Sequence, residues 1–117
     1  MQEAAIGIHE TAISRKVVQL AETKTEFYIA MDGSIVAQLE FVPCVRERDH
    51  MKVILINHTL VADRHRGRGL GRELINRVVK YARAEHRRII PVCPFAKMIL
   101  ESDNKYKDVL LTGHLDS

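Results

Sequence analysis

Residues 52–84 carry the pattern that most restricts how this chain folds. The segment KVILINHTLV (52–61) is apolar enough to be a strand that is buried on both faces. RHRGRGLGREL (64–74) follows it, with three glycines among four arginines. Apolar residues then recur at the spacing of an amphipathic helix of about five turns, namely Leu70, Leu74, Ile75, Val78, Val79 and Ala82. A buried strand that turns into a helix predicts the first half of a right-handed strand-helix-strand crossover.

Two further strands are predicted before this unit. TEFYIAM (25–31) and SIVAQLEFV (34–42) have the composition of strands. Asp32-Gly33 between them is typical of a hairpin turn with positive φ at both central residues. We expect Pro43 to end the second of these strands, because proline lacks the N–H that a sheet requires.

The chain after the helix predicts a short strand and a second helix. IIPVC (89–93) has strand composition, and Pro94 suits the first position of a helix. The apolar face of that helix would come from Phe95, Met98 and Ile99. The predicted fold class is therefore α/β (α+β), a mixed sheet with antiparallel strands first, then the strand-helix-strand crossover, then a C-terminal helix.

Length and composition fit one globular domain over residues 1–117. The chain is 46% hydrophobic and 28% charged. No apolar run approaches the roughly 20 residues that span a bilayer, and the N-terminus lacks a secretory signal pattern. Two cysteines are too few for a disulfide framework. We expect a cytoplasmic protein, a monomer or weak homodimer without membrane contact, with residues 1–15 and 112–117 poorly ordered.

Positive charge is concentrated around the glycine-arginine segment. Residues 64–88 contain nine of the 18 Lys and Arg residues, against two acidic residues, Glu73 and Glu85. Such an excess attracts anions, which predicts a phosphate-bearing small molecule, a nucleic acid or an acidic protein as partner. Glycines at the start of a helix let backbone N–H groups approach an anion closely. A phosphate or pyrophosphate is the ligand that suits this turn best.

The glycine spacing excludes two common phosphate motifs. A P-loop requires Lys and then Ser or Thr after its last glycine, whereas Gly71 precedes Arg72-Glu73. The dinucleotide fingerprint has glycines at its first, third and sixth positions, whereas here they stand at every second residue. The spacing Arg66-x-x-Gly69-x-Gly71 after a buried strand instead resembles the acetyl-CoA signature of the GNAT superfamily of N-acetyltransferases.

This resemblance implies a fold, a cofactor and a reaction. The fold is a minimal GNAT-like domain without the usual helices between the first two strands and without the usual final strands. The reaction is transfer of an acetyl group from acetyl-CoA to an amine of a small molecule or a protein. Backbone amides of the turn would hold the CoA pyrophosphate, and the pantetheine arm would lie beside Leu60 and Val61. The cofactor residues carried over from the turn are Arg66, Gly67, Arg68, Gly69, Leu70, Gly71 and Arg72.

A closer resemblance points to the reacting residues. INHTLV (56–61) and IIPVCPFAKMILE (89–101) are similar to small, single-domain GNAT-like N-acetyltransferases with a Cys/His site, and the similarity covers roughly residues 25–110. It implies that His58 and Cys93 support acetyl transfer. Two routes stay open: His58 takes a proton from an amine that attacks the thioester directly, or Cys93 takes the acetyl group first.

The residues themselves allow both a catalytic and a structural interpretation. If Pro94 begins a helix, Cys93 is its N-cap, and a helix N-terminus stabilises a thiolate. If the predicted strands 52–61 and 89–93 are neighbours in the sheet, His58 lies near Cys93 at the carboxyl ends of these strands. The alternatives are a small buried apolar cysteine and a core histidine. We also expect Pro91 to mark where the predicted strand 89–93 leaves the predicted strand 52–61. This separation would free backbone groups for the amides of pantetheine.

Three functions compete at this point. The first is a GNAT-like N-acetyltransferase, and the second is a CoA-binding module with little turnover in which Cys93 senses the acyl state. The third is a nucleic-acid-binding domain that uses residues 64–88, but three Phe, three Tyr and no Trp leave few side chains on which bases could stack. The other histidines have no metal-ligand spacing with the cysteines, so we expect no metal.

Overall fold

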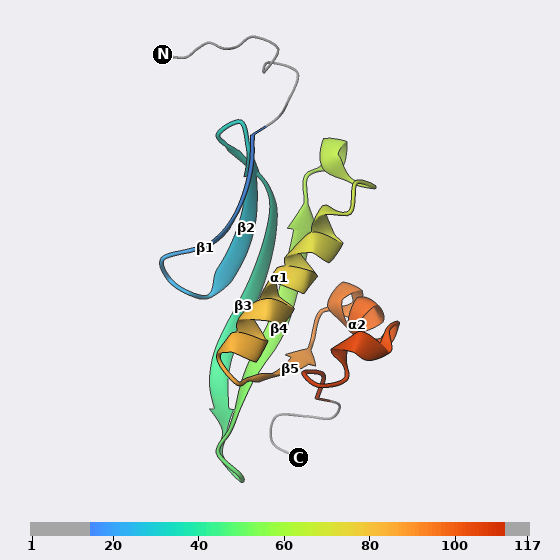
Figure 1. Cartoon of the computed structure of the whole chain (residues 1–117). Helices are drawn as coiled ribbons and strands as arrows, with labels where there is room; N and C mark the ends of the chain where they lie inside the picture. Colours follow the sequence, from blue (N-terminus) through green and yellow to red (C-terminus); the bar gives the residue numbers. More distant parts are fainter. Residues whose placement is uncertain (1–14, 112–117) are drawn as a thin grey trace.

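One sheet and two helices make up residues 15–111, the part of the chain that the computed structural model describes (Figure 1). The sheet has five strands in the order β1-β2-β3-β4-β5. They are β1 (Lys16–Leu20), β2 (Glu26–Met31), β3 (Ser34–Arg46), β4 (Met51–Val61) and β5 (Arg88–Pro91). The helices are α1 (Leu70–Ala84) and α2 (Pro94–Glu101), with the short 3-10 helices η3 (Asp63–His65) and η4 (Asn104–Tyr106).

The sheet is mixed, as the sequence predicts. β1 to β4 pair antiparallel, whereas β5 lies parallel to β4. α1 connects the two parallel strands, so β4, α1 and β5 form the expected crossover. The core lies between one face of the sheet and the two helices, which Figure 1 shows on the same side. Within residues 15–111, no helix covers the opposite face, which we call the open face.

β1 is a strand that the sequence analysis does not predict. All its residues are exposed or half-buried, and within residues 15–111 β2 is its only strand neighbour. Val18 and Leu20 pack against the core, whereas Val17 is 44% exposed. A short edge strand depends on pairing with its neighbour more than on its own apolar content, so its sequence pattern is weak.

The hairpin between β2 and β3 is confirmed, but the predicted end of β3 is wrong. Asp32 and Gly33 have φ values of 51° and 87°, both positive as expected. β3 continues past Pro43, which pairs with Ile54 of β4. Because β2 starts opposite Glu40, Pro43 has a strand neighbour on one side only, and a proline is tolerated at such an edge.

β4 is buried on both faces only in its first half, which corrects a second expectation. Val53 and Ile54 point to opposite faces and are both fully buried. His58 and Leu60, further along the strand, are exposed. β5 pairs with residues 53–56 alone, so the second half of β4 has neither a strand beyond it nor a cover on its open face.

Both helices form where the sequence predicts them, with two corrections. α1 has about four turns rather than five, and its predicted apolar residues are all buried. α2 begins at Pro94, but its buried residues are Ala96, Ile99 and Leu100. Phe95 and Met98 are 36% and 59% exposed. The direction in which the chain leaves β5 decides which side of α2 packs against the sheet. The sequence pattern does not specify this direction.

The chain after α2 returns to the edge of β5. The Ile89 N–H donates to the Val109 carbonyl oxygen at 2.6 Å, and the Leu111 N–H donates to the Ile89 carbonyl oxygen at 2.8 Å. Leu111, the last residue that the structure describes, is thus hydrogen-bonded to the sheet. Pairing of this kind shields one edge of the short β5 strand.

The expectation of poor order at the two ends concerns residues 1–15 and 112–117, which fall outside the described range except for Arg15. The Arg15 N–H donates to Asp32 Oδ1 at 3.1 Å and so joins the chain to the β2–β3 turn. None of the helices in residues 15–111 is long and apolar enough to cross a bilayer.

The turn between β3 and β4 holds an arginine against a carboxylate. The Arg46 guanidinium donates two hydrogen bonds to Asp49, at 3.1 Å and 2.7 Å, and Arg46 is only 6% exposed. These hydrogen bonds hold the pKa of Asp49 at about 2, below the ordinary value of 3.8. The lowered pKa means that ionised Asp49 stabilises the folded chain.

We predict that Asp49→Asn lowers stability at neutral pH and weakens the loss of stability in acid. The contribution of a carboxylate with a lowered pKa is present above a pH of about 4 and is lost as the pH falls through about 2. The urea midpoint of the wild type should therefore fall more steeply over this range than that of the variant. Parallel profiles for the two chains would contradict the prediction.

Candidate functional site

β5 separates from β4 at Pro91, and this separation shapes the site. The two strands pair from Val53–Arg88 to Ile56–Pro91 and no further. The N–H groups of Val92 and Cys93 then both donate to the Ile56 carbonyl oxygen, at 3.0 Å and 2.9 Å, as the chain turns into α2. The expectation that Pro91 marks where the strands part is confirmed. Beyond Ile56, β4 therefore has no strand on its β5 side among the described residues.

The glycine-arginine turn lies beyond the free end of β4. Gly67 and Gly69 both have φ of 79°, in the left-handed region that glycine adopts without strain. Gly69 is the N-cap of α1, so no side chain caps the N–H groups of the first helical turn. A Cβ built on either glycine would meet no atom within 4 Å. These glycines are therefore required by backbone conformation, and the space beside them stays open.

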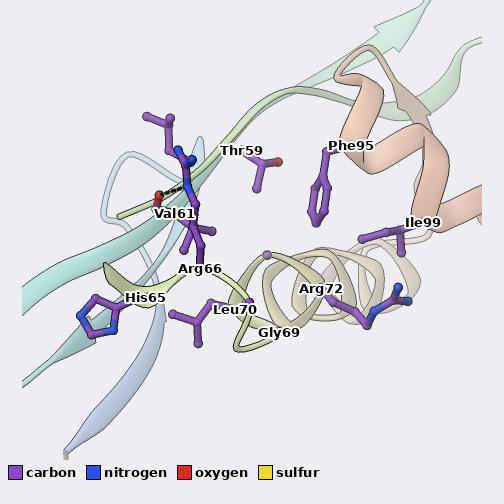
Figure 2. A pocket seen from close by; sticks show the side chains of 12 residues that line it. Thr59, Val61, His65, Arg66, Gly69, Leu70, Arg72, Phe95 and Ile99 are labelled. Carbon is purple, nitrogen blue, oxygen red and sulfur yellow. Dashed lines mark hydrogen bonds between the residues drawn. The ribbon is translucent and has the colours of Figure 1, made fainter. Parts of the chain in front are cut away.

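A cleft of about 460 Å³ lies between the end of β4, this turn, the first turn of α1 and α2 (Figure 2). Its lining includes eight of the nine cofactor residues predicted from sequence: Leu60, Val61, Arg66, Gly67, Gly69, Leu70, Gly71 and Arg72. Arg68 is the predicted residue that does not line it. The structure thus gathers residues from one strand, one loop and one helix around a single cavity.

Four lining residues were not predicted as part of the site: Thr59, His65, Phe95 and Ile99. Phe95 and Ile99 belong to α2, and their sequence signal is an apolar helix face, which does not distinguish a core from a cleft. Phe95 also explains Gly71, because a Cβ on Gly71 would stand 2.8 Å from two atoms of the Phe95 ring. The glycine at this position allows α2 to approach the start of α1.

The arginines give the mouth of the cleft a positive charge. Arg66 donates from Nε to the Val61 carbonyl oxygen at 3.4 Å, the dashed line in Figure 2. Its guanidinium also lies 3.2 Å from Asp63, but the Arg66 side chain is still 66% exposed. Arg72 is exposed as well and projects from the first turn of α1. Exposed guanidinium groups and uncapped helix N–H groups are both donors that suit an anion.

Cys93 and His58, the two predicted reacting residues, lie on different faces of the sheet. Thr59 pairs with Leu39, which is fully buried beneath the helices, so Thr59 faces the helices as well. His58 precedes it and pairs with Glu40, so the alternation of a strand turns His58 to the open face, where it is exposed. Neither His58 nor Cys93 is among the residues that line the cleft.

Cys93 has the position that the sequence predicts, but its neighbour is different. It is the N-cap of α2, followed by Pro94, and it is 8% exposed. Its Sγ lies 3.8 Å from Thr59 Oγ1. The residue of β4 that hydrogen-bonds the thiol is therefore Thr59 and not His58. Cys93 also lies two residues past the end of β5 rather than at the strand end.

The fold and the cleft agree with a family assignment. The chain matches the family model of the GCN5-related N-acetyltransferases over residues 26–109. The chain belongs to this family. It is therefore an acyltransferase, and the acetyl donor of the family is acetyl-CoA.

Solved structures share the fold. A GCN5-like protein from Staphylococcus aureus is 32% identical, with a TM-score of 0.63, over 84% of this chain and 90% of that one. A ribosomal-protein-alanine N-acetyltransferase from Brucella melitensis is 16% identical, with a TM-score of 0.59, over 79% of this chain and 64% of that one. An aminoglycoside acetyltransferase from an uncultured soil metagenomic sample is 20% identical, with a TM-score of 0.56, over 84% and 68%. No curated protein matches the chain.

Within residues 15–111, no group of three or more His, Cys, Asp or Glu side chains is arranged to hold a metal ion. The polar groups around the cleft are arginines, backbone amides, a threonine and a histidine. His65 is the histidine, and its Nδ1 is buried without a hydrogen-bond partner in the described part of the chain. This set of donors suits an anion better than a cation.

We predict that the cost of Gly71→Ala depends on Phe95. Alanine favours a helix over glycine by about 1 kcal/mol, but here its Cβ would displace the Phe95 ring. In the Phe95→Ala background the same substitution should stabilise the chain, whereas in the wild type it should not. Urea unfolding of the two single variants and the double variant measures this coupling. Equal effects of Gly71→Ala in both backgrounds would contradict it.

Proposed function

We propose that the cleft binds acetyl-CoA and that the chain acetylates an amine beside it. In this proposal the pyrophosphate lies at the glycine-arginine turn, against the N–H groups of α1 and the guanidinium groups of Arg66 and Arg72. The uncapped start of α1 and the open space beside Gly67 and Gly69 support it, because a Cβ at either glycine would occupy that space. Arg68 is the predicted cofactor residue with the least support, since it does not line the cleft.

The single observation that carries the proposal is the separation of β4 from β5 at Pro91. Beyond Ile56, the β5 side of β4 has no strand partner in residues 15–111. That side of the strand would offer backbone groups to the amides of a pantetheine arm beside Leu60 and Val61, and Arg66 Nε already donates to the Val61 carbonyl oxygen. The cleft reaches from these residues to the turn. One ligand with an anionic end and an amide-bearing arm would therefore contact both the glycine-arginine turn and the unpaired side of β4.

The reacting residues would stand on the two sides of this gap. Cys93 lies on the helix side, where its backbone N–H is fixed to the Ile56 carbonyl oxygen at 2.9 Å. His58 lies on the open face of the neighbouring strand, where an amine can approach from solvent. Bound acetyl-CoA supplies an acetyl thioester. His58 would accept a proton from the attacking amine, which is the role of a general base.

The route through Cys93 can be written in two balanced steps. The Cys93 sulfur bonds to the acetyl carbon as the bond from that carbon to the CoA sulfur breaks, and the thiol proton leaves with the CoA thiolate. The amine then bonds to the same carbon, the bond to the Cys93 sulfur breaks, and a proton of the amine returns to the cysteine. In the direct route the amine nitrogen bonds to the acetyl carbon as the bond from that carbon to the CoA sulfur breaks, the CoA thiolate leaves, and His58 takes the proton of the amine. Cys93 then forms no bond. The amine belongs to a small molecule or a protein.

We predict that Arg66→Gln and Arg72→Gln each raise the KM for acetyl-CoA by about tenfold and leave the KM for acetyl-pantetheine unchanged. Acetyl-pantetheine lacks the pyrophosphate, and one lost hydrogen bond to a charged group corresponds to roughly this factor. Arg77→Gln is a matched control, because Arg77 is an exposed arginine of α1 that does not line the cleft. Equal losses with both donors would exclude a pyrophosphate at the turn.

We predict that Cys93→Ser and His58→Gln each lower kcat by about a hundredfold with a panel of amines. Mass spectrometry of the wild type mixed with acetyl-CoA alone then separates the two routes, since an acetyl group on Cys93 appears only if the cysteine reacts. Wild-type kcat in both variants would exclude the two residues. CoA binding by calorimetry without turnover of any amine would instead support a module that binds CoA and senses the acyl state.

A further inference from the structure

Thr59 joins the cleft to the buried thiol. We propose that Thr59 is a positioning residue whose hydroxyl holds the sulfur of Cys93 toward the acetyl group. The proposal rests on the proposed function, in the route where Cys93 takes the acetyl group. It differs from the prediction made from sequence, in which His58 is the partner of the cysteine.

The contact follows from the register of the sheet. Thr59 pairs with Leu39 and therefore faces the helices, on the side of β4 where the chain turns into α2. The Cys93 N–H is bound to the Ile56 carbonyl oxygen, so the cysteine is fixed beside β4, close to the point where β5 departs. The Cys93 Sγ then lies 3.8 Å from Thr59 Oγ1, within the range of a hydrogen bond to sulfur.

Of the residues that line the cleft, Thr59 is the one that hydrogen-bonds Cys93 within residues 15–111. Figure 2 shows its side chain beside that of Phe95, between β4 and α2. Cys93 is 8% exposed, so its sulfur has little contact with water. A ligand in the cleft would therefore meet Thr59 before the thiol, and the hydroxyl controls which way the sulfur points.

A hydroxyl suits this position because it can both accept and donate. It accepts from the S–H of the neutral thiol, and after rotation it donates to the thiolate. The thiolate is the nucleophile, and a donated hydrogen bond favours it over the thiol. Valine has the same shape as threonine without the hydroxyl, so Thr59→Val removes the hydrogen bond and keeps the strand. Thr59→Ser keeps the hydroxyl and removes the methyl group.

The first experiment follows the reactivity of the thiol without any cofactor. Cys44→Ser in every chain leaves Cys93 as the single thiol, since the sequence has two cysteines. Alkylation by iodoacetamide is then measured from pH 6 to pH 10, a range that extends about two pH units on either side of the pKa of an ordinary cysteine. We expect Thr59→Val to react about tenfold more slowly at neutral pH, with its profile moved to higher pH. Thr59→Ser should react like its parent.

The second experiment follows turnover with acetyl-CoA and an accepted amine. Thr59→Val should lower kcat by about tenfold and leave the KM for acetyl-CoA within about twofold, because the hydroxyl acts on the sulfur and not on cofactor binding. Thr25→Val is the matched control, since Thr25 is an exposed threonine whose hydroxyl bonds only to the Thr23 hydroxyl among the described residues. Thermal unfolding confirms that the variants fold.

Two results would overturn the proposal. One is an alkylation profile of Thr59→Val that coincides with its parent. The other is a higher KM for acetyl-CoA with kcat unchanged, which would make Thr59 a cofactor contact. Failure of the proposed function gives a different result: neither the wild type nor any variant would then bind CoA. The alkylation experiment would still test the contact between Thr59 and Cys93, because it uses no cofactor.

Discussion

The separation of β5 from β4 at Pro91 is the constraint on which the site depends. Two N–H groups, of Val92 and Cys93, share one acceptor, the carbonyl oxygen of Ile56, and the chain then leaves the sheet. That single turn ends the parallel pairing, leaves the far half of β4 without a second neighbour, and sets Cys93 at the start of α2. A continuous ladder would satisfy the same backbone groups within the protein and leave none for a ligand. The cleft exists because the sheet is incomplete.

Electrostatics and backbone geometry act together at the other end of the cleft. Left-handed glycines turn the chain into α1 without a capping side chain, so the first N–H groups of the helix stay unpaired. Arginines around them would repel one another in the absence of a counter-ion. Both features are unfavourable for folding alone and favourable beside an anion, which is the physical reason to expect a diphosphate there. The pair Gly71 and Phe95 then brings α2 against the start of α1.

The alternation of β4 decides which residue meets the thiol. Neighbouring residues of a strand face opposite ways, so His58 and Thr59 cannot both lie beside Cys93. The register with β3 gives that place to Thr59 and turns His58 to the open face. An acetyltransferase of this design would divide its chemistry between the two faces, with the thiol on one side of the sheet and an approaching amine on the other. On the open face His58 is exposed, and no helix of residues 15–111 covers it.

Local sequence patterns predict the crossover, the Asp32-Gly33 hairpin, the helix from Leu70 and the glycine turn before it, because each is specified by residues close together in the chain. The same patterns missed β1, ended β3 too early at Pro43 and chose the wrong face of α2, since pairing partners and packing angles decide those features. The face of the sheet to which a β4 side chain points depends on the register of β4 with β3, whose paired residue lies about twenty positions earlier in the chain. The sequence by itself therefore determined the family of fold and the left-handed glycine turn before α1, because residues close together in the chain specify both. The tertiary structure alone decided that Thr59 and Phe95 border the cleft, because strand register and helix packing place them there.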